Sequence, residues 1–416
     1  MRVGSGAVRA GAGEVAVTGV GLVTPGGIGA DATWRSMCEG VGTAAADKDL
    51  TGLPVPFSCA VTDFDAEPLL GRRRTRRMDI ITQMAVIAAR EAADASGLGP
   101  DHWDPARVGV ILGSSSSSFE TITVGYERLL SDQVALIPPL GLPRSLTGTS
   151  AAEVAIDLKV TGPNFVTAAG CASGAVALGV ARQLLLAGAL DVVVSGGAET
   201  MRHRLAAACF AQMGALSRRN GEPAAACRPF DAGRDGFVLG EGAGILVLER
   251  AEFARARRAP VLAYLSGHGA ACDAYHLVSP HPDGLGAEQA LREALHEAAW
   301  DPADVDHVNA HGTGTVLNDA IEARYLSGVL PHRPPVTAPK SVLGHAGGAA
   351  AAIEAALAVL SLREQAIPPT ANLDRLDDAM DLDVVTKAPR PAVLRTAMSV
   401  SAAFGGQNAA LAFRAP

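Results

Sequence analysis

Short apolar runs alternate with longer helical patterns along this chain, beginning with an apolar stretch at residues 15–23 that ends at Pro25-Gly26-Gly27. Short β-branched runs bounded by turn residues predict strands, whereas apolar residues spaced three and four apart predict helices. Further strands are predicted at residues 108–112, 191–195, 245–248, 261–265 and 305–309, and helices at 83–96, 172–187 and 287–299. This alternation predicts an α/β fold with a parallel or mixed sheet, preceded by a tail at residues 1–13.

A weak internal repeat relates two parts of the chain. The letters VTA at residues 166–168 lead to Gly170-Cys171-Ala172 and an Ala/Leu-rich helix, and VTA at 336–338 leads to Gly344-His345-Ala346 and another such helix. Matching units predict two related halves in a pseudo-twofold arrangement, with both helix starts facing one central site. Chance similarity between two alanine-rich helices is the alternative explanation.

Composition and charge exclude several classes of protein. A chain of 416 residues with 48% hydrophobic residues can bury a large core, and its net charge of −8 argues against a nucleic-acid-binding protein. The six cysteines lie far apart with no CxxC pair, so neither a disulfide framework nor a metal site is expected. Without a signal-like or membrane-spanning apolar segment, we expect a cytoplasmic protein with no membrane partner.

Cys171 is the first candidate for chemistry, because it follows a strand-like run and opens a helix among small neighbours. The amides and the macrodipole at a helix N-terminus favour a thiolate, so the pattern predicts a lowered pKa and a reactive sulfur. A small buried cysteine with no function would give the same local pattern.

Two histidines each lie beside glycine after an apolar run: His311 in NAHGTGT and His345 in KSVLGH. An imidazole in such a place can donate a hydrogen bond to a thioester oxygen, although either residue alone could be a structural histidine. The joint occurrence of both with Cys171 favours a catalytic set.

Eight motifs carry a specific resemblance to one family: VTGVGLVTP, GCASGA, SGGAET, RPFDAGRDGFVLGEGAG, CDAYHLVSP, NAHGTGT, KSVLGH and FGGQN. Over about residues 14–414 the chain resembles the β-ketoacyl-acyl-carrier-protein synthases, the elongating ketosynthases of type II fatty-acid and polyketide synthesis. The resemblance implies a thiolase-like five-layered α/β/α/β/α fold with duplicated halves, at residues 14–257 and 258–416, and a homologous dimer partner. It implies no cofactor, since phosphopantetheine arrives on the carrier-protein substrate.

The same resemblance implies a role for each catalytic residue. Cys171 accepts an acyl group, a malonyl thioester binds, and His311 and His345 stabilise the oxygen charge that develops as carbon dioxide leaves. The backbone N–H groups of Cys171 and Phe404 form the oxyanion hole, and Phe404 also gates the cysteine.

Supporting residues follow from the same motifs. Lys340, paired with Glu322, resembles the buried ion pair that orders the histidines of the family. Thr313 and Thr315 match the hydroxyls that bind pantetheine amides, although turn chemistry alone could explain both threonines.

Carrier-protein docking has a separate signal in the basic run RRRTRR at residues 72–77 of this acidic chain. Arg73, Arg76 and Arg77 match the docking cations of the family and would steer an acidic carrier protein. A solvated basic face is the alternative.

Several positions differ from the housekeeping fatty-acid pattern, which has threonine at 170 and 343 and glycine at 403. Ala403 predicts a stiffer Phe404 gate, and the serine run at residues 114–118 predicts a roomier or more polar acyl tunnel. The expected function is the catalytic ketosynthase of a type II polyketide or other secondary-metabolite pathway, as a homodimer or paired with a chain-length-factor homologue. A housekeeping synthase, a degradative thiolase and a non-catalytic chain-length or scaffold subunit are the alternatives.

Overall fold

The computed structural model describes residues 14–116 and 118–416, so the predicted tail at 1–13 lies outside the described residues. Among the described residues, one 11-stranded sheet runs through the molecule in the order β11-β10-β14-β15-β9-β1-β8-β7-β5-β6, with β2 paired to β1. Its strands are β1 Val15–Thr24, β2 Gly27–Ile28, β5 Val108–Gly113, β6 Asn164–Thr167, β7 Val192–Thr200, β8 Glu241–Arg250, β9 Ala263–Cys272, β10 Val308–Asn309, β11 Val336–Thr337, β14 Thr396–Ala403 and β15 Gln407–Arg414.

The strand order repeats itself, which confirms the duplication predicted from the sequence. If the five main strands of each half are numbered in chain order, both β6-β5-β7-β8-β1 and β11-β10-β14-β15-β9 read 3-2-4-5-1. The pairings match as well: β5 and β10 are each parallel to two neighbours, whereas β7–β8 and β14–β15 are antiparallel. The halves join where β1 and β9 pair antiparallel.

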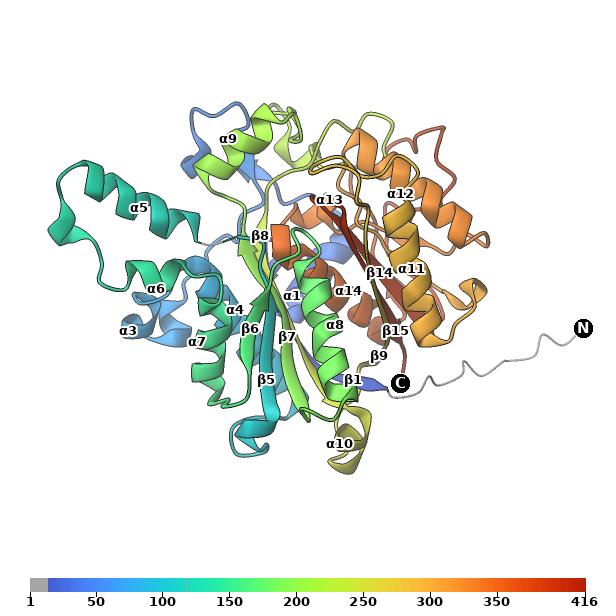
Figure 1. The fold of residues 1–416 in the computed structure, drawn as a ribbon. Coiled ribbons are helices and arrows are strands. Elements are labelled where there is room, and N and C mark those ends of the chain that lie inside the picture. The colour runs from blue at the N-terminus through green and yellow to red at the C-terminus, as the bar shows by residue number, and fades with distance from the viewer. Residues whose placement is uncertain (1–13, 117) are drawn as a thin grey trace, which may run out of the picture.

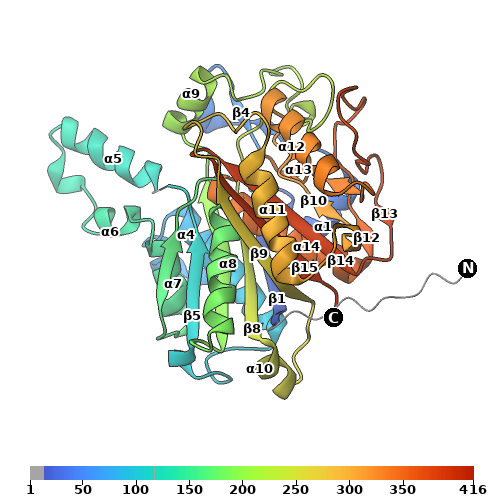
Figure 2. The same cartoon turned by 45° about the vertical axis from the view of Figure 1, so that its right-hand side comes forward.

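Helices form layers on both sides of the two half-sheets. The central layer consists of α8 (Ser173–Leu186) and α14 (Ala350–Glu364), which lie between the halves (Figures 1 and 2). On the outer faces, α4 (Ile80–Ser96) and α7 (Thr149–Leu158) cover the N-terminal half, while α11 (Leu285–Ala298) and α12 (Val316–Val329) cover the C-terminal half. The result is the thiolase-like α/β/α/β/α fold.

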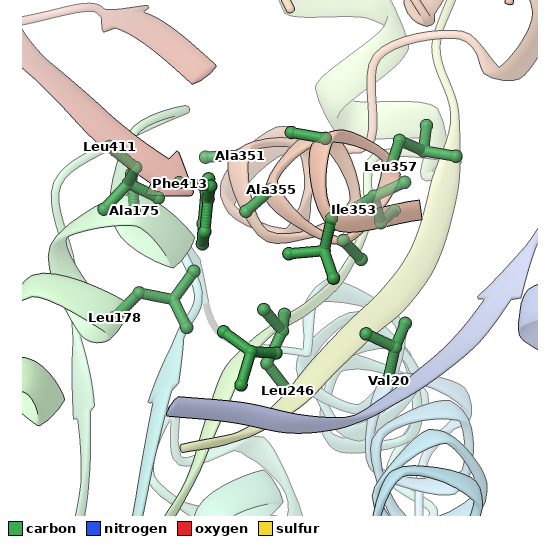
Figure 3. Close-up of a cluster of buried hydrophobic side chains, with 14 of the residues drawn as sticks. Val20, Ala175, Leu178, Leu246, Ala351, Ile353, Ala355, Leu357, Leu411 and Phe413 are labelled. Carbon is green, nitrogen blue, oxygen red and sulfur yellow. The ribbon is translucent and has the colours of Figure 1, made fainter. Parts of the chain in front are cut away.

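The central layer is tight because its helices are rich in small residues. A Cβ at Gly174 of α8 would lie 2.7 Å from the backbone nitrogen of Ala352 in α14, so only glycine permits this approach. Figure 3 shows side chains from both halves around α14, with Leu411 and Phe413 beside the helix and Leu246 and Val20 below it. A helix buried all round has apolar residues on every face, and α14 has them.

The remaining elements connect or flank these layers, and one of them, the short helix at residues 340–343, is fully buried. They are α1 Ala30–Glu39, β3 Ala45–Ala46, β4 Phe57–Ser58, α2 Glu67–Leu70, α3 Arg72–Thr75, α5 Phe119–Leu130, α6 Gly141–Ser145, α9 Arg204–Gln212, α10 Ala251–Ala256, α13 Lys340–Leu343, β12 Ala366–Ile367 and β13 Arg390–Pro391. In both ribbon views α5 stands away from the body as an arm (Figures 1 and 2). No helix within the described ranges has the length and apolar character needed to span a bilayer.

The predicted elements exist, but some of their bounds differ. The strand expected at 305–309 is only Val308–Asn309, because a 3₁₀ turn at Pro302–Asp304 occupies the preceding residues. The strand expected at 261–265 runs instead over Ala263–Cys272, where the letters GHGAAC lack β-branched residues. Pairing with β15 along this segment overrides its weak strand propensity.

Candidate active site

Cys171 lies between the end of β6 and the start of α8, as the sequence predicted. Ala172 is the N-cap residue and Ser173 the first helical residue, so the sulfur precedes the helix rather than belonging to its first turn. The Sγ atom lies 3.1 Å from Nε2 of His345, a residue of the other half of the molecule.

His345 is held rigidly from both sides of its backbone. Its N–H donates to the Val238 carbonyl at 2.8 Å, and its own carbonyl accepts from the Gly240 N–H at 2.9 Å. The ring meets that of Phe237 edge-on, with centroids 5.3 Å apart. The imidazole lies in the turn between α13 and α14 and is therefore positioned by hydrogen bonds to the chain before β8.

His311 completes the catalytic set with a ring centroid 5.6 Å from that of His345. The Lys340 ammonium lies 3.1 Å from Nδ1 of His311. An ammonium group has no acceptor, so it donates to Nδ1 and fixes the ring proton of His311 on Nε2. His311 thus presents an N–H donor at Nε2.

Lys340 forms its ion pair with Glu354, so the predicted pairing with Glu322 is wrong. The Nζ atom lies 2.5 Å from Oε1 of Glu354 and 2.6 Å from the carbonyl oxygen of His311. Together with Nδ1 of His311, these acceptors use all three ammonium protons. Both ends of the ion pair are buried, and Glu354 comes from the middle of α14, where it faces inward.

Glu322 supports the site in another way. Its carboxylate accepts from the backbone N–H of His311 at 2.7 Å and of Gly312 at 2.8 Å. These hydrogen bonds hold the backbone that carries His311, whereas the ion pair of Lys340 is made by Glu354. Burial raises the pKa of Glu322 to about 7 against the lowering effect of the Gly312 and His311 amides.

The resting nucleophile is a neutral thiol, contrary to the lowered pKa expected from the helix N-terminus. Burial raises the pKa of Cys171 to about 11; Lys340 acts against this, and the charges of Glu354 and Glu199 add to it. Burial also holds the pKa of His345 well below its usual range, with Lys340 adding to the effect. His311 is shifted in the same direction, first by burial and then by Lys340 and His345.

A cavity of about 480 Å³ joins these residues, a size suited to a small-molecule substrate. Cys171, His311 and His345 all line it, and so do Thr313, Thr315 and Phe404. The sequence motifs therefore converge on one cavity.

Thr313 and Thr315 face the cavity and also make local bonds. Their hydroxyl oxygens lie 2.9 Å apart, and Thr315 caps α12 by accepting from the N–H of Asn318 at 3.3 Å. The two threonines therefore both stabilise the local turn and line the cavity, so a structural role does not exclude substrate binding.

Phe404 lies at the rim of the cavity with 37% of its surface exposed. Its ring centroid is 6.1 Å from that of Phe210 in α9, which in turn packs against Phe237. Aromatic contacts thus connect Phe404, the predicted gate, through Phe210 to Phe237, which packs against His345.

The three docking candidates lie away from the catalytic residues. Arg73 belongs to α3, and Arg76 and Arg77 follow it; all three side chains are exposed. Arg77 pairs with Glu153 at 3.3 Å. Within residues 14–116 and 118–416, no ion pair involves Arg73 or Arg76, so both guanidinium groups face solvent.

Two buried carboxylates near the site were missed by the sequence analysis. Glu354 is the only charged residue in the apolar stretch 349–362, a signal that could have identified it as a partner for a buried lysine. Glu199, within SGGAET, is fully buried, and nothing in its local pattern distinguishes it from a surface glutamate.

Comparisons with known proteins agree with this site. Residues 12–254 match the family described as beta-ketoacyl synthase, N-terminal domain, and residues 262–374 match beta-ketoacyl synthase, C-terminal domain. The 3-oxoacyl-(acyl-carrier-protein) synthase 2 of Vibrio harveyi is 36% identical over 407 residues, with 96% of this chain and 98% of the relative covered. The protein of the same name from Mycobacterium bovis is 38% identical, with 96% of each chain covered.

Solved structures give the same result. The ishigamide ketosynthase/chain length factor matches with a TM-score of 0.91 and 32% identity, over 97% of this chain and 99% of that one. A type II polyketide ketosynthase, solved with its acyl-carrier protein and bound to the hexaketide, matches with a TM-score of 0.89 and 28% identity, over 97% and 100% of the two chains.

The fold and the Cys-His-His cavity define a condensing enzyme, that is, an acyltransferase of the thiolase-like fold. The chain belongs to the beta-ketoacyl synthase family, as its matches over both the N-terminal and C-terminal domains of that family establish.

Proposed function

We propose that this ketosynthase catalyses decarboxylative condensation of an acyl group on Cys171 with a malonyl group on acyl carrier protein, in a type II polyketide or other secondary-metabolite pathway. The observation that carries this proposal is the 3.1 Å contact between the Cys171 sulfur and His345 Nε2, within a cavity that His311 also lines. The cytoplasm, which supplies acyl carrier proteins, is the proposed location.

Acyl transfer onto Cys171 comes first. Because the sulfur holds its proton at neutral pH, it needs a base, and the neutral His345 imidazole is within reach of that proton. The sulfur attacks the thioester carbonyl while its proton moves to Nε2 of His345. The carbon–sulfur bond of the incoming thioester then breaks, and the proton passes to the departing pantetheine thiolate, which restores neutral His345.

Decarboxylation of the malonyl thioester follows. The bond between the α-carbon and the carboxylate breaks, carbon dioxide leaves, and the electron pair moves onto the thioester oxygen as an enolate. His311 presents an N–H at Nε2 because Lys340 occupies Nδ1. His345 offers a second donor in the tautomer with its proton on Nε2, which it adopts once the acylated sulfur no longer donates to that nitrogen. Donors that are buried and fixed in place stabilise such a charge more than water does.

Condensation completes the cycle. The enolate carbon attacks the acyl carbonyl on Cys171, and the resulting oxyanion is bound by the backbone N–H groups of Cys171 and Phe404. When the carbon–sulfur bond to Cys171 breaks, the β-ketoacyl product remains on the carrier protein, and the thiolate takes up one proton.

Substitution of the nucleophile tests the chemistry. Cys171→Ala removes the sulfur that forms the intermediate, so condensation should fall to background while the fold is unchanged. Cys171→Gln should retain malonyl decarboxylation, because the two histidines remain. Intact-protein mass spectrometry after incubation with acyl carrier protein measures acylation directly, and Cys209→Ala, which changes an exposed thiol on α9, is the matched control. Full condensation activity in Cys171→Ala would refute the mechanism.

The pathway is the finer part of the proposal. The polyketide assignment is supported by departures from the housekeeping pattern at Gly170, Leu343, Ala403 and the serine run. It is also supported by the similarity of this chain to the ishigamide ketosynthase and to the hexaketide-bound ketosynthase. The curated relatives, named 3-oxoacyl-(acyl-carrier-protein) synthase 2, favour a housekeeping fatty-acid role as the second candidate. A non-catalytic subunit is disfavoured because all the catalytic side chains converge on one cavity.

Acyl carrier protein is the proposed substrate-bearing partner, with Arg73, Arg76 and Arg77 as docking cations. Exposed guanidinium groups on a net acidic chain attract an acidic protein locally, and ionic strength weakens that attraction. A chain-length-factor homologue or a second copy is the proposed dimer partner, because two similar solved structures contain a ketosynthase together with a chain length factor.

A further inference from the structure

Glu199, at the end of β7, is a fully buried carboxylate held by serines rather than by a cation. Its Oε2 atom accepts from the N–H of Ser115 at 2.5 Å and from the Ser115 hydroxyl at 2.7 Å, while Oε1 accepts from the Ser116 hydroxyl at 2.8 Å. Ser114 adds a longer bond of 3.3 Å. Within the described parts of the chain no ion pair involves Glu199, and burial raises its pKa.

This serine cage, formed by Ser114, Ser115, Ser116 and Glu199, adjoins the catalytic residues. Ser115 lines the same cavity as Cys171. A Cβ added at Gly348, three residues after His345, would lie 2.5 Å from the backbone nitrogen of Ser115, so the cage packs directly against the turn that follows this histidine. The Glu199 charge is also close enough to contribute to the raised pKa of Cys171.

The cage differs chemically from much of the cavity wall around it. Met201, Phe210, Met213 and Ala403 give the wall apolar surfaces, whereas Ser115 adds a hydroxyl backed by a carboxyl group. In a mostly apolar pocket, a few placed polar groups decide which ligand fits and in which orientation. Ser115 thus joins a buried carboxylate to the wall of the substrate cavity.

We propose that Ser115, backed by Glu199, hydrogen-bonds an oxygen carried by the acyl chain, so that the enzyme prefers oxygen-bearing acyl groups over saturated chains of equal length. The Ser115 oxygen accepts a hydrogen bond from a chain hydroxyl while the Ser115 hydroxyl donates its own proton to the Glu199 carboxylate. When the carboxyl group holds a proton and donates it to Ser115, the Ser115 hydroxyl is free to donate to a chain carbonyl. A saturated chain offers neither partner and leaves this hydroxyl without a bond to the ligand. The proposal rests on the proposed ketosynthase function and defines its substrate class.

Rates of Cys171 acylation by a defined series of thioesters test the preference. The series consists of octanoyl N-acetylcysteamine and its analogues with a hydroxyl or keto group at successive chain carbons, and intact-protein mass spectrometry gives kcat/KM for each. At least one oxygenated analogue should exceed octanoyl by about tenfold in the native enzyme, and Ser115→Ala should reduce that ratio about three- to tenfold.

Matched variants separate recognition from folding. Ser115→Thr retains the hydroxyl and should retain the preference. The control for folding is Ser195→Ala: Ser195 is buried on β7, the strand that carries Glu199, and its hydroxyl donates to the Ile111 carbonyl, so this change should leave the ratio of rates unchanged. A native enzyme that prefers octanoyl to every analogue, or an unchanged ratio in Ser115→Ala, would overturn the proposal. Failure of every thioester to acylate Cys171 would instead overturn the ketosynthase function itself.

Discussion

At Cys171, desolvation outweighs the electrostatic effect of the helix N-terminus. The sulfur precedes the first helical residue, Ser173, by two positions, and its burial raises the pKa to about 11. The field of a helix end acts mainly within the first turn, so it does not compensate for the loss of water. The motif predicted the identity of the nucleophile, but its protonation state depends first on burial and then on charges that only the fold brings near, namely Lys340, Glu354 and Glu199.

Alkylation across a pH range tests this protonation state. Only the thiolate reacts, so iodoacetamide labelling of Cys171 should increase about tenfold per pH unit from pH 7 to pH 10, with no plateau below about pH 10. Peptide mass spectrometry measures the rate at each cysteine. At neutral pH the exposed Cys209 and Cys272 should react before Cys171. A plateau of the Cys171 rate below pH 8 would show that the helix effect dominates after all.

Two departures from the family pattern, Gly170 and Ala403, lie next to each other and fit each other in volume. A Cβ at Gly170 would lie 2.9 Å from the Cβ of Ala403, so the space that a side chain at 170 would need is taken by the alanine. Gly170 has φ +53°, whereas Ala403 ends β14 without a positive φ. The stiffer gate predicted for Ala403 therefore has no basis in backbone strain at that position.

A double-mutant cycle tests this coupling. Gly170→Ala introduces both the contact with Ala403 and an unfavourable positive φ, so it should lower the thermal midpoint by about 2–4 °C. Adding Ala403→Gly should recover about half of that loss, since it relieves the contact and leaves the φ cost. Differential scanning fluorimetry measures all four proteins. Strict additivity of the two changes would contradict the proposed exchange of volume.

At the scale of elements, the repeat was readable because strand, turn and helix recur in the same order. The VTA segments became β6 and β11, and the residues after each turn, Cys171 and His345, meet at Sγ and Nε2. The resemblance assigned the wrong partner to Lys340, although the single charge of Glu354 in the apolar stretch 349–362 was a signal for the right one. The contacts in the structure distinguish the two glutamates: Glu354 pairs with Lys340, whereas Glu322 accepts hydrogen bonds from the backbone of His311 and Gly312.

Paired substitutions test the role of this ion pair between α13 and α14. Lys340→Met leaves the Glu354 carboxylate buried without a cation and should cost about 3–5 kcal/mol of stability. Lys340→Met with Glu354→Leu replaces both charges by apolar groups and should restore most of that stability, while condensation stays low because Nδ1 of His311 has lost its donor. Calorimetry and a condensation assay measure the two effects separately.

An exposed ion pair gives the control. Arg292 and Glu288 lie 2.8 Å apart on α11, where solvent weakens their attraction, so Arg292→Ala should cost less than about 1 kcal/mol. If Glu322→Leu rather than Glu354→Leu compensates Lys340→Met, the pairing inferred from the sequence is correct and the structural assignment fails.

At the scale of the whole molecule, one end of the sheet is left incomplete. Strand β6 pairs with β5 on one side only, and its Phe165 is 38% exposed. The neighbouring arm of α5 and α6 carries many exposed apolar side chains, including Leu130 at 81% and Leu142 at 75% (Figures 1 and 2). An edge strand and an apolar arm at the same end of the molecule are costly in water unless another chain covers them.

We therefore expect a second copy, or a chain-length-factor homologue, to cover β6 and the arm. Phe165→Glu and Leu142→Glu place charges within this face and should shift the protein from dimer to monomer in sedimentation velocity, with acylation lowered if the partner supports the cavity.

Val393→Glu is the matched control: that side chain is 84% exposed and lies in the loop after β13, outside the arm, so its charge should leave the dimer intact. A protein that stays dimeric in all three variants would place the interface elsewhere, and a native monomer would require a different partner chain for this face. The sequence could not predict this arm, because its apolar residues have the same spacing as those of a buried helix. Only the folded structure shows whether the apolar face of such a helix packs inside its own chain or is exposed for another chain.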